Sequence, residues 1–131
     1  MPENRVQTAL QKLLPNAVPQ RIETWTGTGI FDSNWQLECD DEIWVEYKQG
    51  KVKKAHPNCS YRIQLRATQL SWAAKRISNG ANNIYVAYLL GKELLLISLN
   101  INTIAILRKP IDYSNIKVMN EFARIKLVHE I

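Results

Sequence analysis

Three residues whose side chains could bind a cation and activate water lie close together in the sequence: Asp32, Glu46 and Lys48. Glu46 and Lys48 fall in the strand-like run 42–48, and side chains two residues apart in a strand point to the same face. We therefore expect them to project together, with Tyr47 on the other face. Asp32 would add a second carboxylate from the preceding strand. Two carboxylates beside an ammonium group can hold a divalent cation and position an attacking water.

A predicted hairpin would carry these side chains. Apolar and polar residues alternate over 35–39 and again over 42–48, with Asp40-Asp41 between the two runs. We expect one face of this sheet in the core and the other face bearing polar groups. Trp44 falls on the same face as Glu46 and could stack on a base, although most tryptophans in a chain of this size are core or subunit contacts.

Other elements are expected around this hairpin. Apolar residues at helical spacing predict a helix over 3–14, which Pro15 would end. The pattern also predicts a first strand over 20–26, a loop over 49–64 and a second helix over 65–79. A strand pair is predicted over 84–90 and 94–99, joined by Gly91-Lys92-Glu93. In the tail, 101–107 fit a strand or a short helix, and 118–127 carry a helical stripe. No repeat or linker interrupts the chain, so we expect one domain over 1–131.

The composition is that of an ordinary globular protein, with 131 residues, 46% apolar and 22% charged. No apolar run approaches the length of about 18 residues that a membrane span needs, and the first residues lack the layout of a signal peptide. The expected location is intracellular, in the cytoplasm, with no membrane partner. Cys39 and Cys59 do not make a disulfide framework. His56 with Cys59 gives only two ligands, whereas a structural zinc site needs four.

The formal net charge is +5, and its distribution is uneven. Basic residues crowd the stretch that follows the possible catalytic lysine, at Lys51, Lys53, Lys54, Arg62 and Arg66. One reading is a solvated lysine-rich turn. The other is a surface that neutralises the phosphates of nucleic acid. The second reading gains weight because the stretch begins at Lys48.

The order of these motifs resembles that of the PD-(D/E)xK nuclease superfamily, most nearly its VRR-type nuclease domains and the archaeal and phage Holliday-junction resolvases. The matching segments are Gly29-Ile30-Phe31-Asp32, Val45-Glu46-Tyr47-Lys48, Leu65-x-x-x-Gln69-x-x-Trp72, Gly80 and Tyr85-Val86. The resemblance covers roughly residues 3–90. Phe31 stands where the family usually has proline, and the loop after Lys48 is longer and more basic than in compact members.

The resemblance implies a fold of the α/β class with a restriction-endonuclease-like core. This core is a central mixed β-sheet flanked by helices in the order αβββαβ. It would occupy about residues 3–99, with 100–131 as a C-terminal extension.

The resemblance also implies residue roles. Asp32 and Glu46 would be metal ligands, with the Tyr47 carbonyl as a further oxygen. Lys48 would orient or help deprotonate the water and stabilise charge on the phosphate. Gln69 would sit beside the site and support Lys48 or a phosphate oxygen.

A further acid is expected in the site, and two candidates stay open. Glu3 would correspond to the first-helix acid that some members of the family use, but a glutamate in a first turn is also favoured by the helix dipole alone. Glu23 is the other candidate.

The expected activity is that of a Mg²⁺-dependent DNA endonuclease, with Mn²⁺ as a substitute, working as a homodimer or a higher homo-oligomer. Its substrate would be branched DNA, as for a Holliday-junction resolvase, or a specific duplex site, as for a restriction or homing endonuclease. The alternatives are a non-catalytic nucleic-acid-binding module with a degenerate site, and a structural or interaction protein that binds neither metal nor DNA.

Overall fold

A computed structural model describes residues 2–22, 31–37 and 41–121. The elements follow in the order α1 (Pro2–Leu13), β1 (Val18–Arg21), β2 (Ser33–Gln36), β3 (Glu42–Gly50), β4 (Ser60–Tyr61), α2 (Ala67–Ser78), β5 (Ile84–Leu90), β6 (Glu93–Ser98), α3 (Ile101–Ile106), β7 (Ile111–Asp112) and α4 (Tyr113–Met119). Within the described ranges, no helix is long and apolar enough to cross a membrane.

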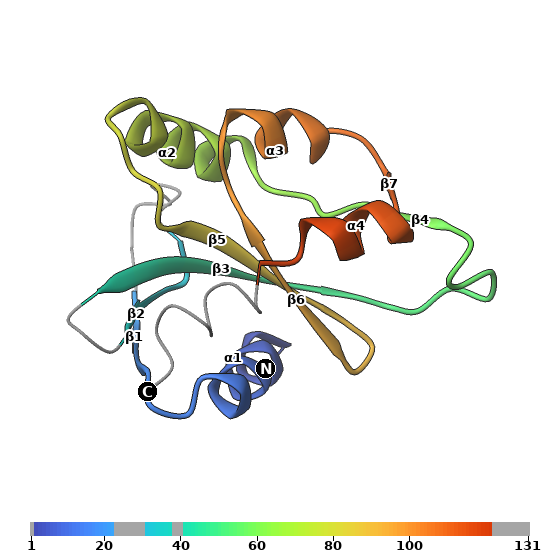
Figure 1. Cartoon of the computed structure of the whole chain (residues 1–131), viewed down its shortest axis with the longest axis horizontal. Coiled ribbons are helices and arrows are strands. Elements are labelled where there is room, and N and C mark those ends of the chain that lie inside the picture. The colour runs from blue at the N-terminus through green and yellow to red at the C-terminus, as the bar shows by residue number, and fades with distance from the viewer. Residues whose placement is uncertain (1, 23–30, 38–40, 122–131) are drawn as a thin grey trace.

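A five-stranded mixed sheet forms the middle layer, in the strand order β1-β2-β3-β5-β6. The neighbours β3 and β5 run parallel, and the other pairs are antiparallel. Helix α1 covers one face of the sheet, and α2, α3 and α4 lie on the other (Figure 1). The expected mixed α/β architecture with helices flanking the sheet is confirmed.

Both faces of the sheet are buried under apolar layers. The layer under α1 includes Val6, Leu10, Trp35, Val45, Tyr47 and Leu89. The layer under α2, α3 and α4 includes Ile63, Ala73, Val86, Leu95, Ile97 and Ile116. The face of the β2–β3 hairpin that was expected to bear polar groups carries Glu46 and Lys48, and α2 lies over it. All seven residues of the interior strand β5 are buried, as a strand covered on both faces requires.

The predicted elements of the first hundred residues are mostly present, with shifted ends. Helix α1 confirms the helix expected over 3–14. Strand β1 begins two residues before the expected strand over 20–26, and residues 23–26 lie outside the described ranges. The β5–β6 turn is shorter than expected, since β6 already begins at Glu93.

The stretch expected as a loop over 49–64 contains strand structure at both ends. Strand β3 continues to Gly50, and Ser60-Tyr61 forms β4, which pairs with β7 about fifty residues further on. A two-residue strand whose partner is so distant leaves no periodicity in the sequence. Its position is decided by the long-range pairing alone.

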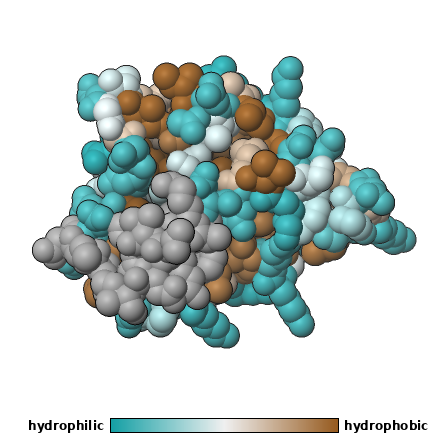
Figure 2. All heavy atoms as spheres, viewed as in Figure 1, coloured by the Kyte–Doolittle hydropathy of each residue, from teal (hydrophilic) through white to brown (hydrophobic). Residues whose placement is uncertain are grey.

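The tail beyond β6 joins the layer under α2, to which it contributes Ile104, Leu107, Ile111 and Ile116. Residues 101–106 are helical, because Asn100 caps the helix by accepting a hydrogen bond from the Thr103 N–H at 2.9 Å. The stripe expected over 118–127 begins where α4 ends, and its last six residues lie outside the described ranges. Figure 2 shows apolar atoms reaching the surface beside α3 and α4, where Ile101 and Val118 are exposed.

We expect Gly50→Ala to destabilise the fold by about 1–3 kcal/mol, as overpacking does. A Cβ atom at Gly50 would overlap the Tyr88 hydroxyl and lie 2.7 Å from Tyr88 Cζ. Urea unfolding gives the free-energy change. Adding Tyr88→Phe removes the hydroxyl oxygen and should recover part of the loss, with Tyr88→Phe alone as the reference. Full stability of Gly50→Ala would contradict the packing described here.

Candidate functional site

Asp32 and Glu46 lie directly across from each other at the end of the β2–β3 pairing. Ser33 pairs with Val45, so Asp32 continues the register opposite Glu46. The Asp32 N–H donates to Glu46 Oε1 at 3.1 Å, and the Tyr47 N–H donates to Asp32 Oδ2 at 3.0 Å. Each carboxylate therefore accepts a hydrogen bond from the backbone of the other segment. This exchange holds the two acids together, as the sequence predicted.

Lys48 lies on the same face of β3 as Glu46. Its Nζ is 3.6 Å from Glu46 Oε2 and 3.4 Å from Gln69 Oε1. Its side chain keeps 23% of its surface exposed, whereas that of Glu46 keeps 4%. Tyr47 points to the opposite face, where its hydroxyl accepts a hydrogen bond from Trp35 Nε1. The predicted alternation along this strand is confirmed.

Gln69 connects helix α2 to the two acids. It lies in the first turn of the helix, is 1% exposed, and donates from Nε2 to Glu46 Oε2 at 2.5 Å. Its Oε1 accepts the Arg66 backbone N–H at 2.9 Å, an N–H that the helix itself leaves without a partner. With its oxygen occupied in this way, the amide must present its NH₂ group to Glu46.

Glu46 is a buried carboxylate, with 3% of its surface exposed. Burial and, after it, the nearby negative charge of Asp32 raise the pKa of Glu46 to about 7, against the lowering effect of Lys48 and of the hydrogen bonds from Asp32 and Gln69. The site therefore lacks positive charge for two ionised acids. A bound cation would supply it.

The donor set suits a hard divalent cation that keeps part of its water. Two carboxylates offer about eight lone-pair positions, and the described hydrogen bonds from Asp32, Tyr47 and Gln69 use three of them, with Lys48 as an ion-pair partner at 3.6 Å. No cluster of three or more His, Cys, Asp or Glu side chains occurs within the described residues. Mg²⁺ is commonly held by only one or two carboxylates together with water and substrate phosphate, so Asp32 and Glu46 could hold such a cation without further side-chain ligands.

The Tyr47 carbonyl points toward the same edge as the acids. In an antiparallel pair, the N–H and C=O of one residue face the same neighbouring strand. The Tyr47 N–H reaches Asp32, and two residues earlier the Val45 carbonyl accepts from Ser33 Oγ on β2 at 3.4 Å. The carbonyl expected as a metal ligand is therefore directed to the side of β3 where Asp32 lies.

The remaining predicted acids are not placed in the site. Glu3 is in the first turn of α1, but its side chain lies outside the described part of the structure. The described residues Val6 and Leu10 of this helix pack on the face of the sheet opposite Glu46. Glu23 belongs to a segment that is not described. The choice between the two acids remains open.

The predicted DNA-contacting residues lie between β3 and α2, and all five are exposed: Lys51, Lys53, Lys54, Arg62 and Arg66. Lys53 is the most constrained of them, since its Nζ donates to the Ser60 carbonyl at 2.5 Å and lies 5.1 Å from the Tyr61 ring centre. His56, which was considered with Cys59 as a zinc ligand, contacts the Tyr61 hydroxyl at 3.0 Å through Nδ1.

An aromatic cluster beside the acids was only partly foreseen. Trp44 is on the Glu46 face, as predicted, but it packs edge-on against Trp72 of α2 at 5.5 Å between ring centres. The Arg76 guanidinium lies 5.3 Å from Trp44 and 5.1 Å from Trp72. The spacing of four residues between Trp72 and Arg76 is the sequence signal for this contact. Trp44 is therefore a packing residue on at least one side.

Comparisons with known proteins do not assign this chain to a family. No protein-family model matches it, and no curated protein matches its sequence. The functional argument therefore depends on the geometry of Asp32, Glu46, Lys48 and Gln69.

We expect Glu46 to make the free energy of unfolding fall as the pH rises from about 4.5 to about 7. Its pKa is about 7 in the folded state against 4.5 for an ordinary glutamate. The folded state therefore holds the proton more tightly, and its stability decreases by about 3 kcal/mol as that proton is lost. Urea unfolding across this range should show the slope, and Glu46→Gln should remove it. Glu42→Gln, an exposed change on the same strand, should keep it.

We expect Gln69→Met to move the pKa of Glu46 above 7, because the hydrogen bond from Gln69 stabilises the ionised carboxylate. Carbon-13 NMR of the glutamate side chains gives the titration midpoint directly. Gln64→Met, at an exposed glutamine just before α2, is the matched control and should leave the midpoint unchanged. An unchanged midpoint in Gln69→Met would show that Gln69 does not tune this acid.

Proposed function

We propose that this chain is a Mg²⁺-dependent DNA endonuclease with a restriction-endonuclease-like core. The observation that carries the proposal is the convergence of Asp32, Glu46 and Lys48 on one edge of the sheet, with Gln69 fixed against them. Two carboxylates can hold a divalent cation and a lysine can stabilise charge on a phosphate. Together with Gln69 they come from three segments, namely the residue before β2, strand β3 and helix α2. With β4 set aside because it belongs to a separate two-stranded sheet, the element order α1-β1-β2-β3-α2-β5 is consistent with the αβββαβ core.

Asp32 and Glu46 would hold the cation, with the Tyr47 carbonyl as a further oxygen. When bound, a divalent cation lowers the pKa of water and offsets the charge of the phosphate. The raised pKa of Glu46 supports this assignment, because a cation between two nearby carboxylates favours their ionised forms.

Lys48 is the group that faces substrate. Its Nζ has three N–H donors, and in the free protein it reaches Glu46 Oε2 and Gln69 Oε1. A donor remains for a phosphate oxygen or for the attacking water. Placed there, the ammonium group stabilises the negative charge that builds on the phosphate. Gln69 is a positioning residue, since it orients Glu46 and supports Lys48.

DNA would lie across the exposed basic residues between β3 and α2. The substrate is either branched DNA, such as a four-way junction, or a specific duplex site. A homodimer would let each protomer cut one strand, which suits both substrates.

We expect cleavage of supercoiled plasmid or of a synthetic four-way junction in Mg²⁺ or Mn²⁺ and none in EDTA. Lys48→Ala should reduce the rate by at least about a hundredfold, since it removes a donor that acts on developing charge, and Glu46→Ala should abolish metal-dependent cleavage. Exposed neighbours of the same type supply the matched controls, Lys75→Ala on α2 and Glu42→Ala on β3.

The choice of DNA substrate distinguishes a junction resolvase from a site-specific endonuclease. Products from the junction alone indicate a resolvase, and fragments of discrete length from a long duplex indicate a site-specific enzyme. Wild-type protein that shifts DNA without cutting it would replace the enzyme by a nucleic-acid-binding module. Undiminished cleavage by Glu46→Ala would disprove the proposed site.

A further inference from the structure

Two adjoining grooves lie between α1 and the ends of the central strands, away from the acidic pair. The larger has a volume of about 790 Å³ and lies between α1 and the β5–β6 hairpin. The smaller, of about 490 Å³, lies beside residues 49–52 at the end of β3. Arg5 and Gly91 line both, so the two grooves adjoin, and together they are called the channel below.

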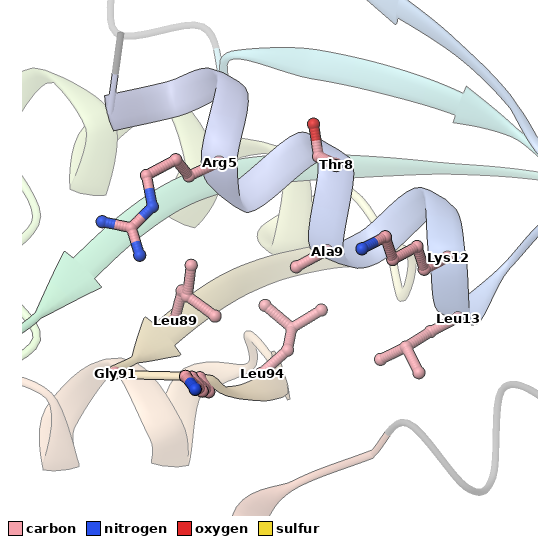
Figure 3. Close-up of a pocket in the computed structure, with 9 residues that line it drawn as sticks. Arg5, Thr8, Ala9, Lys12, Leu13, Leu89, Gly91 and Leu94 are labelled. Atoms are coloured by element: carbon pink, nitrogen blue, oxygen red, sulfur yellow. The ribbon is translucent and has the colours of Figure 1, made fainter.

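Four cations from three separate segments gather along this channel. Arg5 and Lys12 come from α1, Lys51 follows β3, and Lys92 is in the β5–β6 turn. All four are exposed, and none of the described lining residues is acidic. Figure 3 shows Arg5 and Lys12 at opposite ends of the α1 wall, above a floor that includes Leu89 and Leu94. The sequence gives no hint of this cluster, since its members are up to 87 positions apart.

The turn that carries Lys92 depends on glycine. Gly91 has φ +62°, a left-handed conformation that costs other residues free energy, and a Cβ there would lie 2.8 Å from Val52 Cγ2. The Gly91 N–H donates to the Gly50 carbonyl at 3.3 Å. The hairpin turn is thus tied to the end of β3, and this contact brings Lys92 to the same channel as Lys51.

The channel is within reach of a strand bound at the acidic pair. Glu46 and Gly50 are four residues apart on β3, which corresponds to about 13 Å, and Arg5 and Lys12 span about 10 Å along α1. Successive phosphates of one DNA strand rise about 3.4 Å along the duplex axis. The channel is on the α1 face and Glu46 is on the α2 face, so a DNA strand that reached both would pass around the end of β3, about four phosphates from Glu46. The α1 wall matches about three more.

We propose that this channel, lined by Arg5, Lys12, Lys51 and Lys92, binds the phosphate backbone of the DNA that flanks the cleavage site. The inference rests on the proposed nuclease function, whose DNA contacts it extends from the 51–66 stretch to the α1 side. The four cations would contact phosphates, and the sugars would lie over Leu89 and Leu94. Such contacts fix register and carry no sequence information.

The test is the salt dependence of DNA binding in EDTA, where no cleavage is needed. Fluorescence anisotropy with a labelled 30-base-pair duplex compares wild type, Lys12→Gln/Lys92→Gln, and the charge-matched control Lys75→Gln/Lys109→Gln on the opposite side of the sheet. The slope of log K against log salt is negative, and each lost phosphate contact reduces its magnitude by about 1. In the Lys12→Gln/Lys92→Gln protein, called the groove variant, the magnitude should fall by about 2. The control should keep the wild-type value.

The outcomes distinguish this inference from the proposed function. Equal slopes for the groove variant and wild type overturn the channel while leaving the nuclease site untouched. A reduced slope with no metal-dependent cleavage supports the channel and removes the enzyme. Circular dichroism of the groove variant confirms that it is folded. If wild type fails to bind the duplex at low salt, the channel is disproved.

Discussion

Glu46 is a carboxylate buried beneath α2, and the arrangement of the site follows from keeping it there. An isolated buried charge is costly, so its oxygens are met by the Asp32 N–H, the Gln69 amide and the Lys48 ammonium. These donors do not fully compensate for burial next to Asp32, and the pKa of Glu46 stays near 7. The cation of the proposed function would relieve this residual shortage of positive charge.

Gln69 determines how α2 meets the sheet. A glutamine on the buried stripe of a helix would destabilise packing unless both ends of its amide were paired. Here the oxygen closes the first turn at the Arg66 N–H and the nitrogen reaches Glu46, so one side chain caps the helix and orients the acid. Beside this contact, Trp44 of β3 packs against Trp72 of α2, and Arg76 of α2 lies over both rings.

The charge of the chain is divided between the two sides of β3. One basic set follows β3 toward α2, and a second lies along α1 and the β5–β6 turn, with Lys51 common to both readings. The proposed enzyme and the proposed channel therefore share Lys51, the residue at which the two basic sets meet.

The sequence by itself determined most of the local elements and the three candidate site residues Asp32, Glu46 and Lys48. Alternation placed Trp44, Glu46 and Lys48 on one face, and helical spacing placed α1 and α2, because both signals arise from the geometry of a single segment. Only the tertiary structure decided that α2 covers the polar face and buries Glu46, that β4 pairs with β7, and that Arg5, Lys12 and Lys92 meet. These outcomes depend on contacts between segments far apart in the chain, and such contacts leave no period or spacing in the sequence.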